Sequence, residues 1–79
     1  MQNLYEASKT KSQKNKPLKI VSVPNIALLQ GLGLRTNTKV SIHTRYALGG
    51  PVLLRVEDTF AVAIGKDIAT QIIIEEASK

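Results

Sequence analysis

The stretch L-G-L-R-T-N-T-K-V-S-I-H-T-R-Y-A-L-G-G-P-V-L-L-R-V, residues 32–56, decides the fold of this chain. It is typical of the end of a short helix, a turn, a strand, a Gly-Gly-Pro turn at residues 49–51 and a second strand. Nothing in this stretch has the pattern of a catalytic site. It predicts a small β structure that presents a surface, so the sequence favours contact over catalysis.

Alternating apolar residues predict further short strands on both sides of this stretch. Residues 19–23, 60–64 and 72–74 supply them, and residues 65–71 have room for one helical turn before the last strand. Apolar residues from Ile26 to Leu32 predict a two-turn helix with Asn25 as its N-cap. About five short strands favour a small barrel, because closure removes exposed edges. Tyr46 is expected on the face of Val40 and Ile42, and the core is expected to contain Val40, Ile42, Val52, Leu54, Val56, Phe60, Val62 and Ile64.

Two turn residues are expected to adopt the left-handed conformation. Gly33 stands where a helix-ending glycine belongs, and Leu34 supplies the apolar contact of a Schellman motif. Asn37 is the best left-handed candidate in the turn at residues 35–38, because asparagine tolerates positive φ. Both residues are therefore predicted to shape turns rather than to bind a ligand.

Length and composition limit the function classes. The 79 residues allow one domain, and the absence of cysteine excludes disulfides and zinc–thiolate sites. No apolar run approaches the roughly 18 residues of a membrane span, and the N-terminus lacks the apolar segment of a signal peptide. We therefore expect a cytoplasmic protein that does not insert into a membrane.

The positive charge is concentrated near the N-terminus. The net charge is +5, and residues 1–19 carry +4 of it, from five lysines and one glutamate. These residues contain few large apolar groups, so residues 1–17 are predicted to form a disordered basic arm, followed by a folded domain at 18–79. The nearly neutral domain argues against nucleic acid as a partner, although the lysines keep a small nucleic-acid-binding barrel as an alternative.

Four groups of residues resemble the ferrous iron transport protein A family, FeoA, of small bacterial proteins. They are Leu32-Gly33-Leu34, Thr38-Lys39-Val40, Leu48-Gly49-Gly50-Pro51-Val52 and Lys66-Asp67-x-Ala69-x-x-Ile72, and their order and spacing are similar to the family across residues 18–76.

This resemblance implies a mainly β fold, a small SH3-like β-barrel with one short inserted helix and a helical turn before the last strand. It also implies an accessory role beside FeoB, the membrane Fe(II) transporter that carries a G-protein domain. The same barrel occurs at the C-terminus of iron-dependent repressors, so a free-standing regulatory barrel is a further alternative. The segment 26–31 lacks the charges common in the family, so partner contacts through those positions are not carried over.

No residue set in the sequence suits catalysis, a cofactor or a metal. His43 is the only histidine, so a metal site lacks a second nitrogen ligand and a serine nucleophile lacks an assured base. Glu57 and Asp58 are adjacent, but acidic residues are common in turns. We expect a monomer that is not an enzyme and needs no cofactor.

Partner contact is assigned to the rim formed by the helix end and the Gly-Gly-Pro turn. Leu48 and Leu53 are the largest apolar residues left outside the expected core, so they are the predicted anchors beside Gly49, Gly50 and Pro51. The alternative is that a barrel corner or the helix covers both leucines. The sequence does not decide between assembly, gating and GTP turnover as the process that such contact affects.

Overall fold

One curved antiparallel sheet forms most of this chain. A computed structural model describes residues 2–10, 14–46 and 48–77. Its elements are β1 (Gln2–Asn3), α1 (Leu4–Ser8), β2 (Leu18–Ser22), α2 (Ala27–Gly31), β3 (Lys39–Arg45), β4 (Val52–Val56), β5 (Phe60–Ile64), α3 (Lys66–Ala69) and β6 (Ile73–Glu76). The strand order is β1-β6-β2-β3-β4-β5. The mainly β class and the helical turn before the last strand are confirmed.

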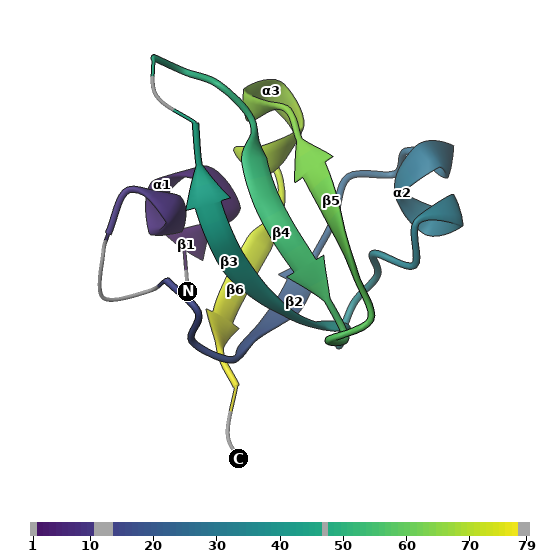
Figure 1. Ribbon diagram of the computed structural model, residues 1–79. Helices are drawn as coiled ribbons and strands as arrows, with labels where there is room; N and C mark the ends of the chain where they lie inside the picture. The colour runs from purple at the N-terminus through teal and green to yellow at the C-terminus, as the bar shows by residue number, and fades with distance from the viewer. Residues whose placement is uncertain (1, 11–13, 47, 78–79) are drawn as a thin grey trace.

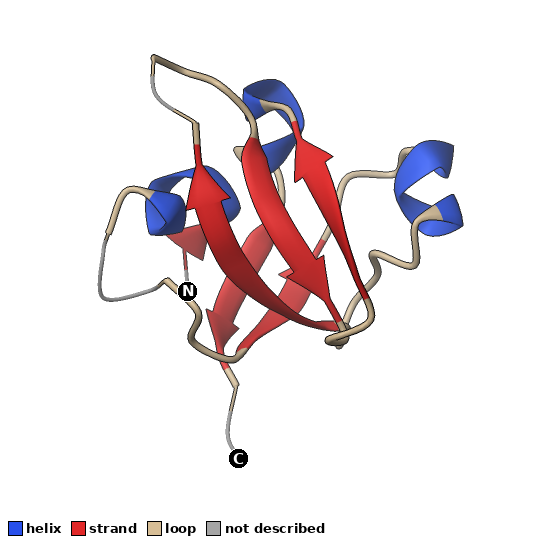
Figure 2. Cartoon of the chain, in the orientation of Figure 1, coloured by secondary structure: helices blue, strands red, loops and turns tan. Residues whose placement is uncertain are grey.

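The sheet bends so that its two halves face each other across the core, as in a small SH3-like barrel. Figure 1 shows β3, β4 and β5 crossing in front of β2 and β6. The three helices lie around the margins of the sheet, with α1 and α3 near its upper end and α2 to one side (Figure 2). None of the helices in the described ranges is long and apolar enough to cross a membrane.

Alternation along the strands fills this core. Inward-facing residues of β4 pair with those of β3 and β5, for example Leu54 with Ile42 and Val62. β2 and β6 close the other side through Ile20 and Ile74, which are both fully buried. The core therefore follows from the period of two that a half-buried strand requires.

The N-terminal segment is folded, which corrects the disordered arm expected for residues 1–17. Asn3 caps α1 by accepting the Glu6 N–H at 2.7 Å, and the Leu4 N–H donates to the Ile72 carbonyl at 2.7 Å. Leu4, Tyr5 and Ala7 lie in the core. Their burial comes from contact with distant strands, which offsets an ordering entropy that this short segment could not offset by itself. Residues 1 and 11–13 of the predicted arm lie outside the described residues.

A β-bulge in β3 corrects the side-chain direction that was expected for Tyr46. The register shifts between Ile42, which pairs with Leu54, and Thr44, which pairs with Leu53. One extra residue reverses the alternation beyond it, so Arg45 pairs with inward-facing Val52. Tyr46, expected on the core face, is 51% exposed.

Phe60 was expected in the core and is 43% exposed, because it opens β5 at the margin of the barrel.

The turn after α2 has the predicted left-handed glycine. Gly33 has φ 81°, its N–H donates to Gln30, and the Leu34 N–H donates to Leu29 at 2.9 Å. These two bonds form a Schellman motif, and Leu29 and Leu34 are both buried. Asn37 also has positive φ, at 76°. The helix begins later than predicted, with Ile26 rather than Asn25 at the N-cap and without a capping side chain.

Candidate partner-binding surface

The loop between β3 and β4 presents the most exposed apolar residue among those described. The Tyr46 N–H donates to the Pro51 carbonyl at 3.0 Å and closes the loop. Leu48 and Gly49 have φ 61° and 76°. A left-handed leucine costs about 1–2 kcal/mol, yet the Leu48 side chain is 101% exposed and packs against no core residue that would compensate. An exposed residue in a strained conformation suggests a role outside folding.

Leu53 lies on the outer face of the sheet, near the base of the same hairpin. It pairs with Thr44 on β3 and with Ala63 on β5, and it is partly buried. Ala63 and its neighbour Ala61 are small and exposed, so they leave the Leu53 side chain accessible from above the sheet. We call Leu48, Gly49, Gly50, Pro51 and Leu53 the hairpin surface.

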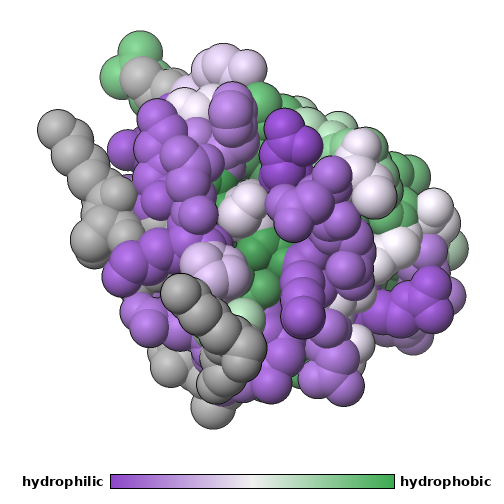
Figure 3. Space-filling model, turned by 60° about the horizontal axis from the view of Figure 1, so that its bottom comes forward, coloured by the Kyte–Doolittle hydropathy of each residue, from purple (hydrophilic) through white to green (hydrophobic). Residues whose placement is uncertain are grey.

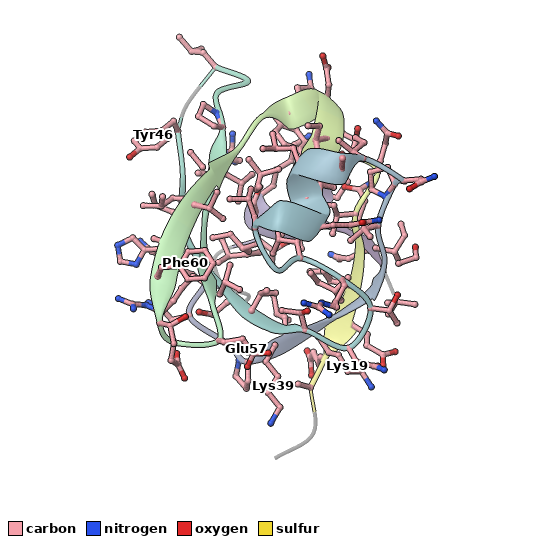
Figure 4. All side chains as sticks on the ribbon, turned by 90° about the vertical axis from the view of Figure 1, so that its right-hand side faces the viewer. Lys19, Lys39, Tyr46, Glu57 and Phe60 are labelled. Carbon is pink, nitrogen blue, oxygen red and sulfur yellow. The ribbon has the colours of Figure 1, made fainter. Side chains whose placement is uncertain are left out.

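The helix end does not belong to this surface, which corrects the predicted rim. Gly33 lines a groove with Val56 and Phe60 at the far end of β4 from the Gly-Gly-Pro turn. That turn lies beside α3 instead, since a Cβ atom placed on Gly49 would be 3.9 Å from Cδ of Lys66. Figure 4 shows the two ends of the barrel, with Tyr46 at the end of the β3–β4 loop and Glu57 and Lys39 at the other. Sequence spacing alone could not place the two turns, because strand direction determines which loops share an end.

The groove at the other end is a second accessible apolar site. It has a volume of about 370 Å³ and includes Leu32 of the helix end and the exposed ring of Phe60. Leu28, one helical turn before Leu32, is 63% exposed. We call this site the helix-end groove. It was not predicted from the sequence, because Phe60 continues the alternation of apolar residues and was therefore assigned to the core. The turn at Glu57-Asp58-Thr59 just before it was the available signal that Phe60 lies at the margin.

Charge differs between the two ends. The Tyr5 ring, beneath the base of the hairpin, has three cations within 6 Å of its centroid: Lys9 at 5.1 Å, Lys66 at 5.3 Å and Arg45 at 5.9 Å. The lower end of Figure 1 is mainly hydrophilic around a small apolar centre (Figure 3). There Lys39 lies next to Glu57, whose Oε2 accepts the Lys39 N–H at 3.4 Å.

The side chains considered for chemistry lie apart. His43 is exposed on β3, and Glu57 and Asp58 form the turn between β4 and β5, with φ 54° and 59°. Within the described ranges, no three His, Cys, Asp or Glu side chains gather as metal ligands do. The arrangement offers surfaces for contact at both ends of the barrel.

Comparison with known proteins identifies the family and the fold. The family model of the FeoA domain matches residues 12–76. The NMR structure of a FeoA-like protein from Clostridium acetobutylicum superimposes with a TM-score of 0.67 at 18% sequence identity, covering 87% of this chain and 84% of that one. No match was found among the curated proteins. At this identity the structural likeness supports the fold, while the sequence match identifies the family.

Proposed function

Because this chain belongs to the FeoA family, we propose that it is a non-catalytic accessory module that binds the cytosolic part of a FeoB-type transporter. Family membership links the chain to ferrous iron transport, and the family is one of small accessory domains. On this proposal the protein is a bacterial, cytoplasmic monomer. Iron is the cargo of its partner, and the module itself holds no cofactor.

The observation that carries this proposal is the conformation of Leu48. A fully exposed, left-handed leucine at a hairpin tip contributes nothing to the core, but it suits insertion into an apolar pocket of a partner. Burying a leucine side chain contributes about 1.5–3 kcal/mol. Leu53 and the glycines lie beside it, and the glycines carry no side chain that would keep a partner backbone away.

The scarcity of aromatic side chains on the barrel favours a protein partner over nucleic acid, although the folded N-terminal segment adds +4 to the charge of the domain. Residues 20–79 carry six basic and five acidic residues, a net charge of +1. Duplex binding depends on neutralising several phosphates, and stacking on single strands needs several aromatic side chains. Only Tyr46 and Phe60 are aromatic beyond residue 19.

The test measures binding of the purified chain to the cytosolic G-protein domain of the FeoB transporter from the same organism. We expect Leu48→Ala and Leu53→Ala each to weaken binding by about 1–2 kcal/mol, roughly 5- to 30-fold. Leu28→Ala is the matched control, because it removes the same atoms from an exposed leucine of α2, one helical turn before Leu32 of the helix-end groove.

The outcomes separate the possible interfaces. If Leu28→Ala alone weakens binding, the partner uses the helix-end groove and the hairpin surface is not the interface. If the parent protein fails to bind the transporter domain at all, the proposed partner is wrong. Circular dichroism checks that each variant is folded. This check matters most for Leu53→Ala, because Leu53 is partly buried and its loss can destabilise the fold.

A further inference from the structure

A cationic pocket lies beside the hairpin base and is distinct from both apolar surfaces. Its volume is about 200 Å³. Among the described residues that line it, three are cationic, three carry hydroxyl groups and none is acidic: Lys9, Lys14 and Arg45, then Ser8, Thr10 and Thr44, with Ile42 as the remaining one. We call it the Arg45 pocket. A lining of cations and hydroxyl donors without a carboxylate is complementary to an oxyanion.

Three segments far apart in the sequence build this pocket. The end of α1 supplies one side and β3 supplies another. The third side is held against β3 by the Asn15 N–H, which donates to the Ile42 carbonyl at 2.9 Å, and by a bridge between Lys14 and Ile42. The bulge after Ile42 turns Arg45 into the space between them. Backbone contacts therefore hold the Lys14 side of the pocket against β3.

Arg45 has a buried hydrogen-bond donor that meets no acceptor among the described residues. Its Nε atom is buried and has no partner within the described part of the chain. The guanidinium lies 5.9 Å from the centroid of the Tyr5 ring, which is itself buried. A buried N–H without an acceptor is costly, and its cost is greater on a charged group. An anion in the adjoining pocket would face the guanidinium charge, and it would reach Nε once the Arg45 side chain turns toward it.

We propose that the Arg45 pocket binds a phosphate group or a similar oxyanion, with Arg45 and Lys14 as its principal donors. Lys9 contributes less, because its Nζ lies 3.4 Å from Glu6 Oε2 in an exposed pair. Drug-sized ligands occupy pockets of about 300–1,000 Å³, so the smaller Arg45 pocket suits a single anionic group. That group has two sources, free phosphate and the phosphate of a lipid headgroup.

The first experiment titrates the ¹⁵N-labelled full chain with inorganic phosphate at constant ionic strength, held with sodium chloride. We expect saturable shifts of the Arg45 Nε–H signal and of the Ser8 and Thr10 amides. Arg45→Lys keeps the charge but removes Nε, so it should weaken binding about tenfold or more, as loss of one hydrogen bond to a charged group predicts. Arg55→Lys, on the exposed outer face, is the matched control and should change nothing.

Equal affinity of the parent and Arg45→Lys for phosphate overturns the proposal, as does the absence of saturable shifts in the parent. If Arg45→Lys fails to fold, Lys14→Gln and Lys39→Gln decide between the alternatives. Both remove one exposed lysine, but only Lys14 lines the pocket. We expect Lys14→Gln to weaken phosphate binding about threefold and Lys39→Gln to leave it unchanged. If both variants weaken binding equally, the effect comes from the net charge of the protein and the site is rejected.

Vesicles identify the source of the phosphate. The chain is sedimented with phosphatidylcholine vesicles that contain or lack phosphatidic acid, with Arg45→Lys in parallel. Binding that needs both phosphatidic acid and Arg45 supports a lipid headgroup as the ligand. Arg45-dependent binding of inorganic phosphate without vesicle binding supports a free anion. Vesicle binding that is unchanged by Arg45→Lys excludes the pocket as a headgroup site.

Discussion

The two ends of the barrel differ in the hydrogen bonds that surround their left-handed residues. At the end that carries the helix turn and the β4–β5 turn, positive φ angles are accompanied by local hydrogen bonds. Gly33 takes part in the Schellman motif, and the Thr38 hydroxyl donates to the Gly33 carbonyl at 3.0 Å while accepting the Arg35 N–H at 3.2 Å. The Glu57 N–H donates to Lys39 at 2.9 Å. This end holds the fold in register.

At the hairpin end, the left-handed residue has no such support among the described residues. Leu48 is fully exposed in a loop closed by the Tyr46–Pro51 bond. Beneath the loop, however, α1 and α3 are anchored by buried residues, with Leu4 and Ala69 both at 0% exposure. The hairpin end therefore joins a base anchored by buried residues to a strained, accessible tip, which suits a contact surface. The turn end suits stability.

Removing a buried side chain from the base of the hairpin end should destabilise the protein more than any other substitution considered. Leu4→Ala should destabilise the protein by about 2–5 kcal/mol, because it removes a fully buried side chain and leaves a cavity. That is a large fraction of the stability expected for a domain of this size. Urea unfolding measures the change, with Leu48→Ala as an exposed control that should change stability little. A loss below about 0.5 kcal/mol would mean that α1 is not part of the core.

The second prediction concerns the helix stop. Gly33→Val should cost about 1–3 kcal/mol, since it places a β-branched residue at positive φ. A Cβ atom on Gly33 meets nothing within 4 Å, so the cost comes from the backbone and not from crowding. Gly31→Ala is the control, because Gly31 also has open space around it but lies in the helix. Denaturation midpoints that move the same way for both variants would contradict the assigned turn.

The third prediction tests the hydrogen bonds of the turn end. Thr38 is buried, and its hydroxyl bridges the Gly33 carbonyl and the Arg35 N–H. Thr38→Val keeps the shape and leaves both backbone groups without this partner, which should cost about 1–2 kcal/mol. Thr36→Val, at an exposed position in the same turn, is the control. Equal thermal shifts for the two variants would show that the bridge does not stabilise the turn.

Glycine substitutions at a left-handed residue of each end compare the two ends directly. Leu48→Gly and Asp58→Gly each relieve a left-handed residue, so each should change stability by at most about 1 kcal/mol, with relief of strain offset by unfolded-state entropy. Only Leu48→Gly should weaken binding to the transporter domain. Calorimetry measures unfolding and titration measures binding, and equal binding by both variants would remove the proposed functional difference between the ends.

Much of the fold was predictable because it depends on local chemistry. The mainly β class followed from alternation, and the stop at Gly33 followed from the αL preference of glycine. Other features depended on partners distant in the sequence. The bulge after Ile42 leaves no pattern in the alternation of β3, so the exposure of Tyr46 and the direction of Arg45 were not predictable. Of the predicted rim, Leu48 proved fully exposed, and the helix end lies elsewhere.

Local sequence features were enough to indicate which short segments could form strands and where the helix ends. These properties follow from side-chain periodicity, backbone preference and composition, which act over a few residues. The tertiary structure alone decided that Leu4 and Tyr5 fold against the barrel, that the Gly-Gly-Pro turn lies beside α3, and that Arg45 lines a cationic pocket. Each of these depends on burial and charge shared between segments that only the closed sheet brings together.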